Sequence, residues 1–390
     1  MDIDTLSRSP IGRLVRIQGN DARTGDYDHF AFLPDDLGDH VDLETSTWTA
    51  VSRAMEGMGR LRQACGQLPN PRLLIAPALV QEALTTSALE GTYGELSDVL
   101  EARLPQRVTA SAEVREIRAY EAMANKAFDW MDDRPITLGV LSDLQGALAE
   151  RSRKPPRDPG RVREHQVFIG PEGSTVYDSR FVPPPPGMQL RGGLQAWQDW
   201  VNAVHDLPIV VTCALAHYQF ESLHPFGDGN GRIGRLVFIL QLLRSGALPE
   251  PALTISPWLL KRRTEYQDTL LATSATGDWN PLVTFFSRAI QDQCDAHVEV
   301  AQNLLDWLAE SRQALADHRW TGLIAKIVED LIDWPVITAR SVVEHYEVSA
   351  PSAHHAIDRL VEVGILKELT GRSYGRRFGA VRVMELVESL

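Results

Sequence analysis

The chain has 390 residues, more than one hydrophobic core usually organises, so we expect two or three domains. Its net charge of −13 excludes nucleic-acid binding over the whole surface, which needs clustered Lys and Arg, although a small basic patch is compatible with it. The sequence has neither a run of about 18 apolar residues nor an apolar leader, so we expect a cytoplasmic protein with no signal peptide and no membrane contact.

The first 152 residues are predicted to form an irregular arm followed by helices. Residues 1–45 are polar and rich in Asp and Gly, which predicts an arm without regular structure that lies on the rest of the molecule. Apolar residues then recur at helical spacing with few breakers, in the ranges 47–68, 71–90, 111–132 and 137–152. The Gly-Thr-Tyr-Gly stretch at 91–94 ends the second of these helices.

The composition changes after residue 152, where prolines and glycines become frequent. Two short β-type runs, 166–169 and 174–177, flank a Gly-Pro-Glu-Gly turn, and this pattern predicts a β-hairpin. The alternative is a long surface loop with little regular structure. Because an isolated hairpin is only marginally stable, it needs a scaffold to pack on or a partner strand.

Helices resume with an apolar stripe that begins at Leu194. Residues 208–223 are largely apolar, which predicts a central helix that buries Cys213 as an inert thiol, and no cysteine has the spacing of a metal site. Another apolar helix is predicted over 233–245, and two further helical patterns occupy 281–318.

The last segment is predicted to be a separate unit. Helical patterns cover 323–332, 338–346 and 351–363, and a glycine turn at 371–375 then separates two short β-type runs. Helix, short helix, helix and hairpin is the element order of a winged helix-turn-helix.

The charge of this unit does not decide its partner. Residues 336–379 contain six basic and five acidic side chains. Arg372, Arg376 and Arg377 cluster in the predicted wing, which favours DNA, whereas Asp358 and Glu362 lie on the predicted recognition helix. DNA binding and protein binding therefore both stay open for this unit.

Chemically active residue types concentrate in residues 224–235, where one helix stops at His224 and another begins a few residues later. The free N–H groups and the dipole at the start of the second helix form an anion site. Asp228 offers a hard oxygen for Mg²⁺ on phosphates. Arg232 and Arg235 share one helical face and can bind β- and γ-phosphates. A histidine is suited to accepting a proton near neutral pH.

Three other interpretations of this stretch are weaker. Residues 229–234 match GxGxxG, but that dinucleotide motif needs a preceding strand, and a helix is predicted here. A Walker loop needs Gly-Lys-Ser/Thr, which is absent from the stretch. A plain glycine-rich turn would not explain why a histidine, a carboxylate and two arginines converge on it.

Residues 224–235 resemble the motif of the Fic family, HPFx(D/E)GNGRxxR, and match it at all nine specified positions. Residues 217–221 and 182–185 are also similar to the family, and the resemblance covers residues 80–290. It implies an all-α fold: a Fic-type helical bundle with a short β-hairpin flap, to which the small C-terminal winged helix-turn-helix domain is added.

The resemblance implies a protein adenylyltransferase (AMPylase), a nucleotidyltransferase that moves AMP from ATP to a target protein with Mg²⁺ as cofactor. His224 would deprotonate the target Ser, Thr or Tyr hydroxyl, Asp228 would hold Mg²⁺, and the flap would align the target by strand addition. The residues that would bind the nucleotide are Gly229, Asn230, Gly231, Arg232, Arg235 and, near the adenine, Tyr266.

A second motif lies upstream, where Thr86 to Gly91 resemble the inhibitory helix of the family, [S/T]xxxE[G/N]. By itself, Glu90 followed by Gly is an ordinary helix end with a solvated carboxylate. Beside a Fic motif, the resemblance implies that Glu90 pairs with Arg235 and removes one phosphate contact, so that ATP binds out of line for attack. The enzyme would then be autoinhibited.

These expectations divide the chain into four parts. Residues 1–105 form an N-terminal helical region with the inhibitory helix at 80–91, and residues 106–290 form a catalytic core with the flap at 164–180. Linking helices follow over 291–325, and the winged domain covers 326–390. One alternative function is a DNA-binding regulator whose Fic core senses nucleotide. Another is a bifunctional enzyme that also removes AMP, with Glu90 positioning a water. A homodimer is compatible with both.

Overall fold

The computed structural model describes residues 1–68, 70, 72–104, 110–130, 134–171, 173–371 and 375–390. Its helices are α1 (Ile3–Leu6), α2 (Thr45–Gln67), α3 (Arg72–Leu89), α4 (Leu96–Glu101), α5 (Ala112–Trp130), α6 (Leu138–Ala149), α7 (Met188–Asn202), α8 (Ile209–Leu223), α9 (Asn230–Arg244), α10 (Ser256–Lys261), α11 (Arg263–Thr276), α12 (Asn280–Asp317), α13 (Leu323–Asp330), α14 (Ala339–Tyr346), α15 (Ala350–Glu362) and α16 (Val381–Ser389). The strands are β1 (Gly12–Asp21), β2 (Gly25–Pro34), β3 (Val336–Ile337), β4 (Lys367–Glu368) and β5 (Phe378–Gly379).

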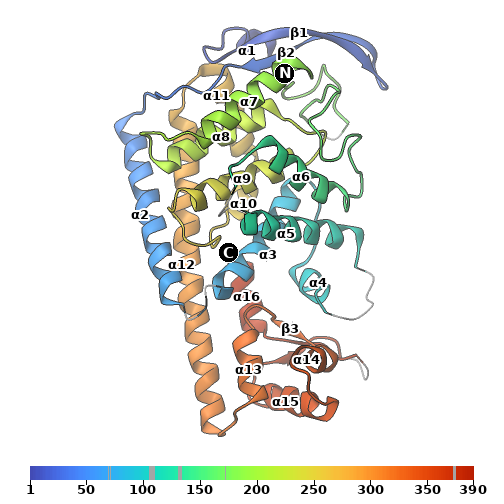
Figure 1. Ribbon diagram of the computed structural model, residues 1–390, viewed down its shortest axis with the longest axis vertical. Coiled ribbons are helices and arrows are strands. Elements are labelled where there is room, and N and C mark those ends of the chain that lie inside the picture. The colour runs from blue at the N-terminus through green and yellow to red at the C-terminus, as the bar shows by residue number, and fades with distance from the viewer. Residues whose placement is uncertain (69, 71, 105–109, 131–133, 172, 372–374) are drawn as a thin grey trace.

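The molecule is elongated and mostly helical, which confirms the predicted all-α class (Figure 1). The β1–β2 hairpin lies at one end and helices α13–α15 lie at the other, while α12 runs along the body between them. Among the described residues, no helix combines the length and the apolar character that crossing a membrane requires.

The centre of the body is built by α8 and α9, whose side chains are nearly all buried. The predicted central helix is confirmed, with Pro208 as its N-cap residue and Cys213 fully buried and free. Because both helices are buried on every side, the short connection between them is held in a fixed place in the core. This connection is the motif 224–235.

The N-terminal arm is more regular than the sequence analysis predicted. Strands β1 and β2 pair antiparallel from Gly12 opposite Pro34 to Asp21 opposite Gly25. In β2, alternate residues Tyr27, His29 and Ala31 are buried, which is the period-two pattern of a half-buried strand. The expectation of an irregular arm was wrong because the many Asp and Gly residues of this region hid that alternation. The arm does lie on another segment, as expected.

The flap also differs from the predicted hairpin. Its chain reverses direction between Ile169 and Phe181, which form a single antiparallel bridge, and residues 174–177 form no strand. Glu172 of the predicted turn lies outside the described residues. The scaffold that the flap needs is supplied by the N-terminal arm, where the Phe32 N–H donates to the Val182 carbonyl at 2.9 Å.

The region predicted to hold two helical patterns is one continuous helix of 38 residues, α12. It contains no glycine, and its proline, Pro281, stands in the first turn, where a missing N–H costs nothing. The domain boundary predicted between residues 290 and 291 therefore falls inside a helix. The boundary predicted between 105 and 106 lies outside the described residues.

The C-terminal unit has the predicted element order. Helices α13, α14 and α15 are followed by β4 and β5, and β5 lies between β3 and β4 in a three-stranded sheet. Residues 372–374, with Arg372 of the predicted basic cluster, lie outside the described residues. The final helix, α16, was not predicted, and it returns the chain to the body, where Val387 packs in the same apolar cluster as residues of α3, α4 and α5.

Candidate active site

The connection between α8 and α9 forms a tight turn that exposes helix ends. Helix α8 ends at Leu223, and His224 adopts the left-handed conformation with φ 50° and ψ 64°. Gly229 has φ 81°, and α9 begins directly after it. A left-handed residue reverses the chain at a helix end, and for a histidine this conformation costs about 1–2 kcal/mol. The turn is therefore held by specific contacts.

Side chains from inside and outside the motif hold the turn closed. The Asn230 side chain accepts from the Phe226 N–H and donates to the Phe226 carbonyl, both at 2.8 Å. Gln145 of α6 donates to the Asp228 carbonyl at 3.1 Å. The Asn230 side chain is thus engaged within the loop, so any contribution of this residue to the predicted anion hole is limited to its backbone N–H.

The start of α9 presents free backbone donors. In the described part of the chain, the first backbone hydrogen bond into α9 runs from the Ile233 N–H to the Gly229 carbonyl at 3.0 Å, and residues 230–232 donate to no backbone carbonyl. These N–H groups lie at the positive end of the helix dipole. These N–H groups are therefore available to an anion, and the anion site stays a prediction.

His224 is oriented as a proton acceptor. Its Nδ1 lies 3.3 Å from the Glu221 carbonyl, which can only accept, so Nδ1 carries the proton and Nε2 keeps a free lone pair. Burial and the positive charge of Arg163 lower the pKa of His224 to about 4, against a smaller opposing effect of Glu90. The imidazole is therefore neutral at pH 7 and able to act as a base.

Arg232 is bound by two carboxylates. Nη1 donates to Glu116 of α5 at 2.7 Å, and Nη2 donates to Asp228 at 3.2 Å. Its side chain is 2% exposed, and the buried Nε has no hydrogen-bond partner among the described residues. A buried N–H without a partner is costly, and an anion at the start of α9 would offer it one.

Arg235 is bound by the end of α3. Nε donates to Thr86 Oγ1 at 2.8 Å, and Nη2 donates to the Thr86 carbonyl at 3.1 Å and to Glu90 Oε1 at 2.7 Å. Desolvation alone would raise the pKa of Glu90, but the charge and the hydrogen bond of Arg235 lower it. Glu90 is therefore ionised and held by Arg235.

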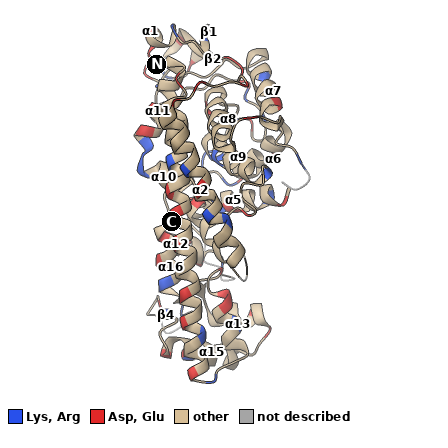
Figure 2. Ribbon diagram, turned by 90° about the vertical axis from the view of Figure 1, so that its left-hand side faces the viewer, with Lys and Arg blue, Asp and Glu red and all other residues tan. Residues whose placement is uncertain are grey.

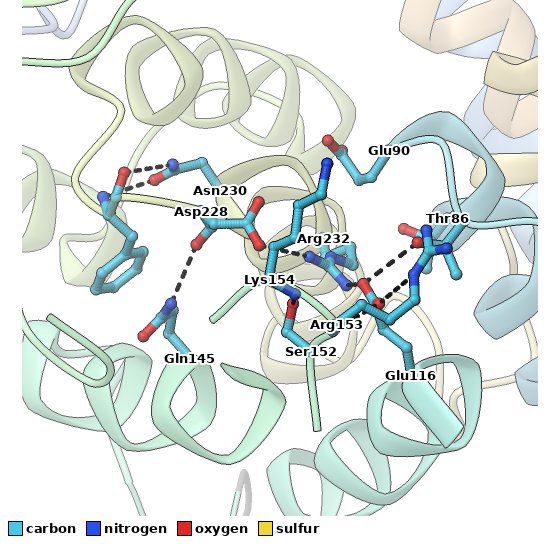
Figure 3. Close-up of polar contacts among 12 residues, drawn as sticks. Thr86, Glu90, Glu116, Gln145, Ser152, Arg153, Lys154, Asp228, Asn230 and Arg232 are labelled. Carbon is cyan, nitrogen blue, oxygen red and sulfur yellow. Dashed lines mark hydrogen bonds and ion pairs between the residues drawn. The ribbon is translucent and has the colours of Figure 1, made fainter. Parts of the chain in front are cut away.

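The Glu90 carboxylate also lies against the first turn of α9. A Cβ built on Gly231 would clash with Glu90 Oε1 and with the Arg235 guanidinium. Glycine at 231 thus makes room for the carboxylate at the helix N-terminus, which is the predicted phosphate position. Figure 3 shows Thr86 and Glu90 at one side of the site, Glu116 below, and Asp228 and Asn230 at the other side, with Lys154 extending between them.

Comparisons with known proteins agree with this geometry. A family described as "Fic/DOC family" matches residues 135–242, and one described as "Fic/DOC family N-terminal" matches residues 48–129. The chain therefore contains an N-terminal and a catalytic-type Fic/DOC domain, over residues 48–129 and 135–242.

Two curated relatives of this Fic protein are named Protein adenylyltransferase Fic. That of Drosophila virilis is 32% identical over 233 residues, covering 58% of this chain and 44% of the relative. That of Drosophila melanogaster is 26% identical over 260 residues, covering 65% and 47%. The chain therefore spans less than half the length of these relatives.

A solved structure shares the fold. The crystal structure of a Fic family protein from Desulfovibrio desulfuricans aligns with 87% of this chain and 97% of its own, with a TM-score of 0.53 at 20% identity. At this identity the likeness concerns the fold alone. The alignment covers far more of the chain than residues 135–242, so the known fold includes helices outside that region.

Tyr266 is placed differently from the other predicted residues of this Fic protein. It is 7% exposed and stands in an aromatic cluster with Phe285 and Phe286, and its hydroxyl lies 2.7 Å from Nε2 of His217. Burial raises the pKa of Tyr266 and lowers that of His217 to about 3. The structure thus places Tyr266 in the core behind Arg235, and the adenine contact stays a prediction.

A magnesium–nucleotide complex fits the carboxylate at Asp228. The described residues contain no group of three His, Cys, Asp or Glu side chains that could hold a metal by themselves. Magnesium bound with a nucleotide needs only one or two protein carboxylates, because phosphates and water supply the other oxygens. The Asp228 side chain is 43% exposed, and only Oδ2 contacts Arg232. Its Oδ1 is the oxygen that suits this role.

Three residues of the site escaped the sequence analysis. Glu116, Gln145 and Arg163 contact the motif from α5, from α6 and from the segment before the flap. Each stands in an ordinary helical or loop pattern, far from the motif in sequence. The packing of α5 and α6 against α9 brings Glu116 and Gln145 to the motif, and the loop between α6 and the flap brings Arg163.

Proposed function

We propose that this protein is an adenylyltransferase that transfers AMP from ATP to a Ser, Thr or Tyr hydroxyl of a target protein, and that Glu90 holds it in an inhibited state. The observation that carries the proposal is the neutral His224, with Nε2 free, beside free N–H groups at the start of α9. Two arginines and one carboxylate at the same turn complete a site for a polyphosphate.

The reaction follows from these positions. His224 Nε2 accepts the proton of the target hydroxyl, whose oxygen then bonds to the α-phosphorus as the bond to the β-phosphate oxygen breaks and pyrophosphate leaves. The N–H groups of α9 stabilise the negative charge that develops on the α-phosphate. Arg232 and Arg235 hold the departing phosphates. Asp228 would hold Mg²⁺, which neutralises phosphate charge when bound with the nucleotide.

The flap is the proposed docking place for the target. Apart from the Ile169–Phe181 bridge, the described backbone of residues 164–180 is in no strand, so it retains donors and acceptors for an added strand. The N-terminal arm holds the flap from one side, and Tyr27 packs edge-on against Phe168 with ring centroids 5.7 Å apart. An extended target segment would pair with the free backbone of the flap, which the N-terminal arm supports from the other side.

The inhibition follows from competition for one place. Glu90 occupies both the guanidinium of Arg235 and the space at Gly231 where a phosphate would lie. A bound ATP would have to displace the carboxylate or keep its γ-phosphate away from Arg235. Either choice lowers the fraction of ATP in line for attack.

The proposal is tested with ATP labelled on the α-phosphate, Mg²⁺, and the full chain as parent and as Glu90→Gly. We expect the variant to label itself or proteins of a lysate at least about tenfold faster than the parent, because one inhibitory contact is worth over 1 kcal/mol. A mass increase of one AMP identifies the product. Adding His224→Ala to the variant should abolish labelling.

The matched control is Glu95→Gly, which removes an exposed carboxylate five residues further along without touching Arg235. It should label at the parent rate. Equal labelling by parent and Glu90→Gly, with both proteins folded, would contradict inhibition by Glu90. No labelling by any variant would contradict AMP transfer. Release of AMP from pre-labelled protein by the parent chain would support the bifunctional alternative.

A further inference from the structure

Arg163 is a buried cation that contacts both the flap and the catalytic turn. It lies in the loop between α6 and the flap, is only 1% exposed, and donates four side-chain hydrogen bonds to backbone carbonyls. The carbonyls that it binds are those of His224 at 2.8 Å, Pro184 at 2.6 Å, His165 at 3.2 Å and Leu223 at 3.3 Å. The Arg163 N–H also donates to the carbonyl of Pro225 at 2.9 Å.

This cation has no carboxylate partner among the described residues, which is unusual for a buried arginine. Burial lowers the pKa of Arg163 to about 10, so the guanidinium keeps its charge at neutral pH. Its counter-charge comes from the C-terminal end of α8, because Leu223 and His224 carry the carbonyls at the negative end of the helix dipole.

We propose that Arg163 is a positioning residue for AMP transfer, because it joins the base of the flap to the three carbonyls at 223–225 that surround His224. The inference rests on the proposed function. The flap positions the attacking hydroxyl, and His224 accepts its proton. The distance between the flap and His224 therefore decides whether the hydroxyl comes within hydrogen-bond distance of Nε2. One guanidinium fixes that distance, since it binds Pro184 and His224 at once.

The left-handed backbone of His224 supports this assignment. A histidine at φ 50° persists only when its surroundings determine the conformation. The bonds from Arg163 to the carbonyls of residues 223, 224 and 225 hold this backbone from another segment of the chain, in addition to the contacts of His224 with Phe220 and Glu221 of α8. Lysine could not replace the planar guanidinium of Arg163, because an ammonium group has fewer N–H donors and does not hold them in fixed directions.

The charge of Arg163 has a second effect on the same histidine. Burial is the larger cause of the low pKa of His224, and Arg163 lowers it further, while Glu90 raises it. Among the described residues, Arg163 and Glu90 are the charged groups that shift the pKa of His224. When Glu90 is removed, burial and Arg163 both still lower this pKa, so the base stays neutral.

The test uses the full chain carrying Glu90→Gly, with Arg163→Met and Arg163→Lys added separately. Arg163→Met should slow AMP transfer about 100-fold and leave ATP affinity little changed, because a misplaced base costs rate without removing phosphate contacts. NMR titration of the His224 ring should show its pKa rising by about one unit. Arg163→Lys should restore the pKa but not the rate. Arg161→Met, an exposed arginine two residues earlier, is the control.

Three results would overturn the inference: an unchanged rate in Arg163→Met, a fall in ATP affinity as large as the fall in rate, or a rate fully restored by Arg163→Lys. If Arg163→Met does not fold, Arg163→Lys decides through the rate alone. If the Glu90→Gly parent transfers no AMP, the proposed function fails. The ring titration and amide exchange at the flap base still report whether Arg163 positions these two parts.

Discussion

Each of the two motif arginines is bound by a carboxylate from outside the motif, Arg235 by Glu90 and Arg232 by Glu116, and these two carboxylates differ in exposure. Glu90 comes from the end of α3, and its side chain is 31% exposed. Glu116 comes from the middle of α5 and is 6% exposed, and it also accepts from Thr92, two residues after Glu90. Glu116 is therefore the more deeply buried support, whereas the greater exposure of Glu90 fits its proposed displacement from Arg235.

Glu116→Gln should lower the free energy of unfolding by about 2 kcal/mol, because it weakens a buried charge-assisted hydrogen bond to Arg232. It should also weaken ATP binding, since Arg232 loses its orientation. Urea unfolding and ATP titration measure both effects. Glu113→Gln, one turn earlier on α5 and bound to the exposed Arg153, is the control and should change stability by less than about 0.5 kcal/mol. Equal effects of the two variants would contradict a special role of Glu116.

His297 should make the protein less stable in acid. It is buried in α12 with Nδ1 2.7 Å from the Gln293 carbonyl, and burial lowers its pKa to about 4. The unfolded histidine titrates near its ordinary pKa of about 6.5, so the unfolded chain binds the proton first as the pH falls. The stability contributed by neutral His297 is complete above pH 6.5 and is lost between about 6.5 and 4, up to about 3 kcal/mol.

Urea unfolding at several pH values tests this. His297→Gln should flatten the fall in unfolding free energy between pH 7 and 4.5, while His355→Gln at an exposed position should not. The buried His217 and His224 change stability in the same direction, since their pKa values are also lowered. Glu221, whose pKa burial raises to about 7, acts in the opposite direction. Identical pH slopes for parent and His297→Gln would contradict the prediction.

At the scale of elements, the contact between α2 and α12 supports the whole body. The two helices run in the same direction, because Thr47 bonds to Asn280 near their starts and Arg60 pairs with Asp295 further along. Between these points, a Cβ built on Gly57 would lie 3.2 Å from Cys294 Cβ, a close approach that favours glycine.

Gly57→Leu should destabilise the protein by about 2 kcal/mol through overpacking against α12. Gly59 lies two residues further on the same helix, is exposed, and has no atom within 4 Å of a built Cβ. Gly59→Leu should therefore stabilise the protein by up to about 1 kcal/mol, because leucine favours helix. Urea unfolding compares the two. A shift of the same sign in both variants would show that helix propensity, not packing, sets the response.

At the scale of the whole molecule, the C-terminal unit is attached to α3 and α4, the helices on either side of Glu90 in the chain. Arg377 of the predicted wing pairs with Glu101 of α4, and Arg103 donates to the Asp333 carbonyl at 3.2 Å. Val336 and Val387 pack in the same apolar cluster as Leu79 of α3.

DNA binding by the C-terminal unit stays a prediction, and the described basic side chains give it limited support. Arg340 pairs with Glu344, Arg376 with Glu368, and Arg359 lies over the Trp320 ring. Figure 2 shows acidic and basic residues mixed over the end of the molecule that carries α13 and α15. The arrangement of the helices favours a binding role, but the charges are largely neutralised within the chain.

Arg377→Glu should loosen the attachment of the C-terminal unit, because it places a like charge against the partly buried Glu101. Hydrogen exchange at the amides of α4 should become faster, and the double variant Glu101→Arg/Arg377→Glu should slow it again. Arg382→Glu is the control, since its pair with Glu310 is solvent-exposed on both sides. Unchanged exchange in Arg377→Glu would show that apolar packing alone holds the unit.

The class of the fold, many helices of the body and the residues of the motif 224–235 could be predicted from the sequence. Helical periodicity and caps are local signals, and the motif is contiguous, so neither needs knowledge of the rest of the chain. Local signals failed where the structure depends on distant contacts. The N-terminal arm forms a hairpin, the flap lacks the expected pairing of two strands, and α12 is one helix where two were predicted.

Only the tertiary structure decided what surrounds the motif. The approach of α3 places Glu90 on Arg235, that of α5 places Glu116 on Arg232, and Arg163 reaches His224 from the segment before the flap. The Glu90 pair was expected from a resemblance, and the other two had no signal in the chain. A buried charge is stable only beside groups that compensate it, and these groups lie far apart in the sequence. They meet only when the helices pack.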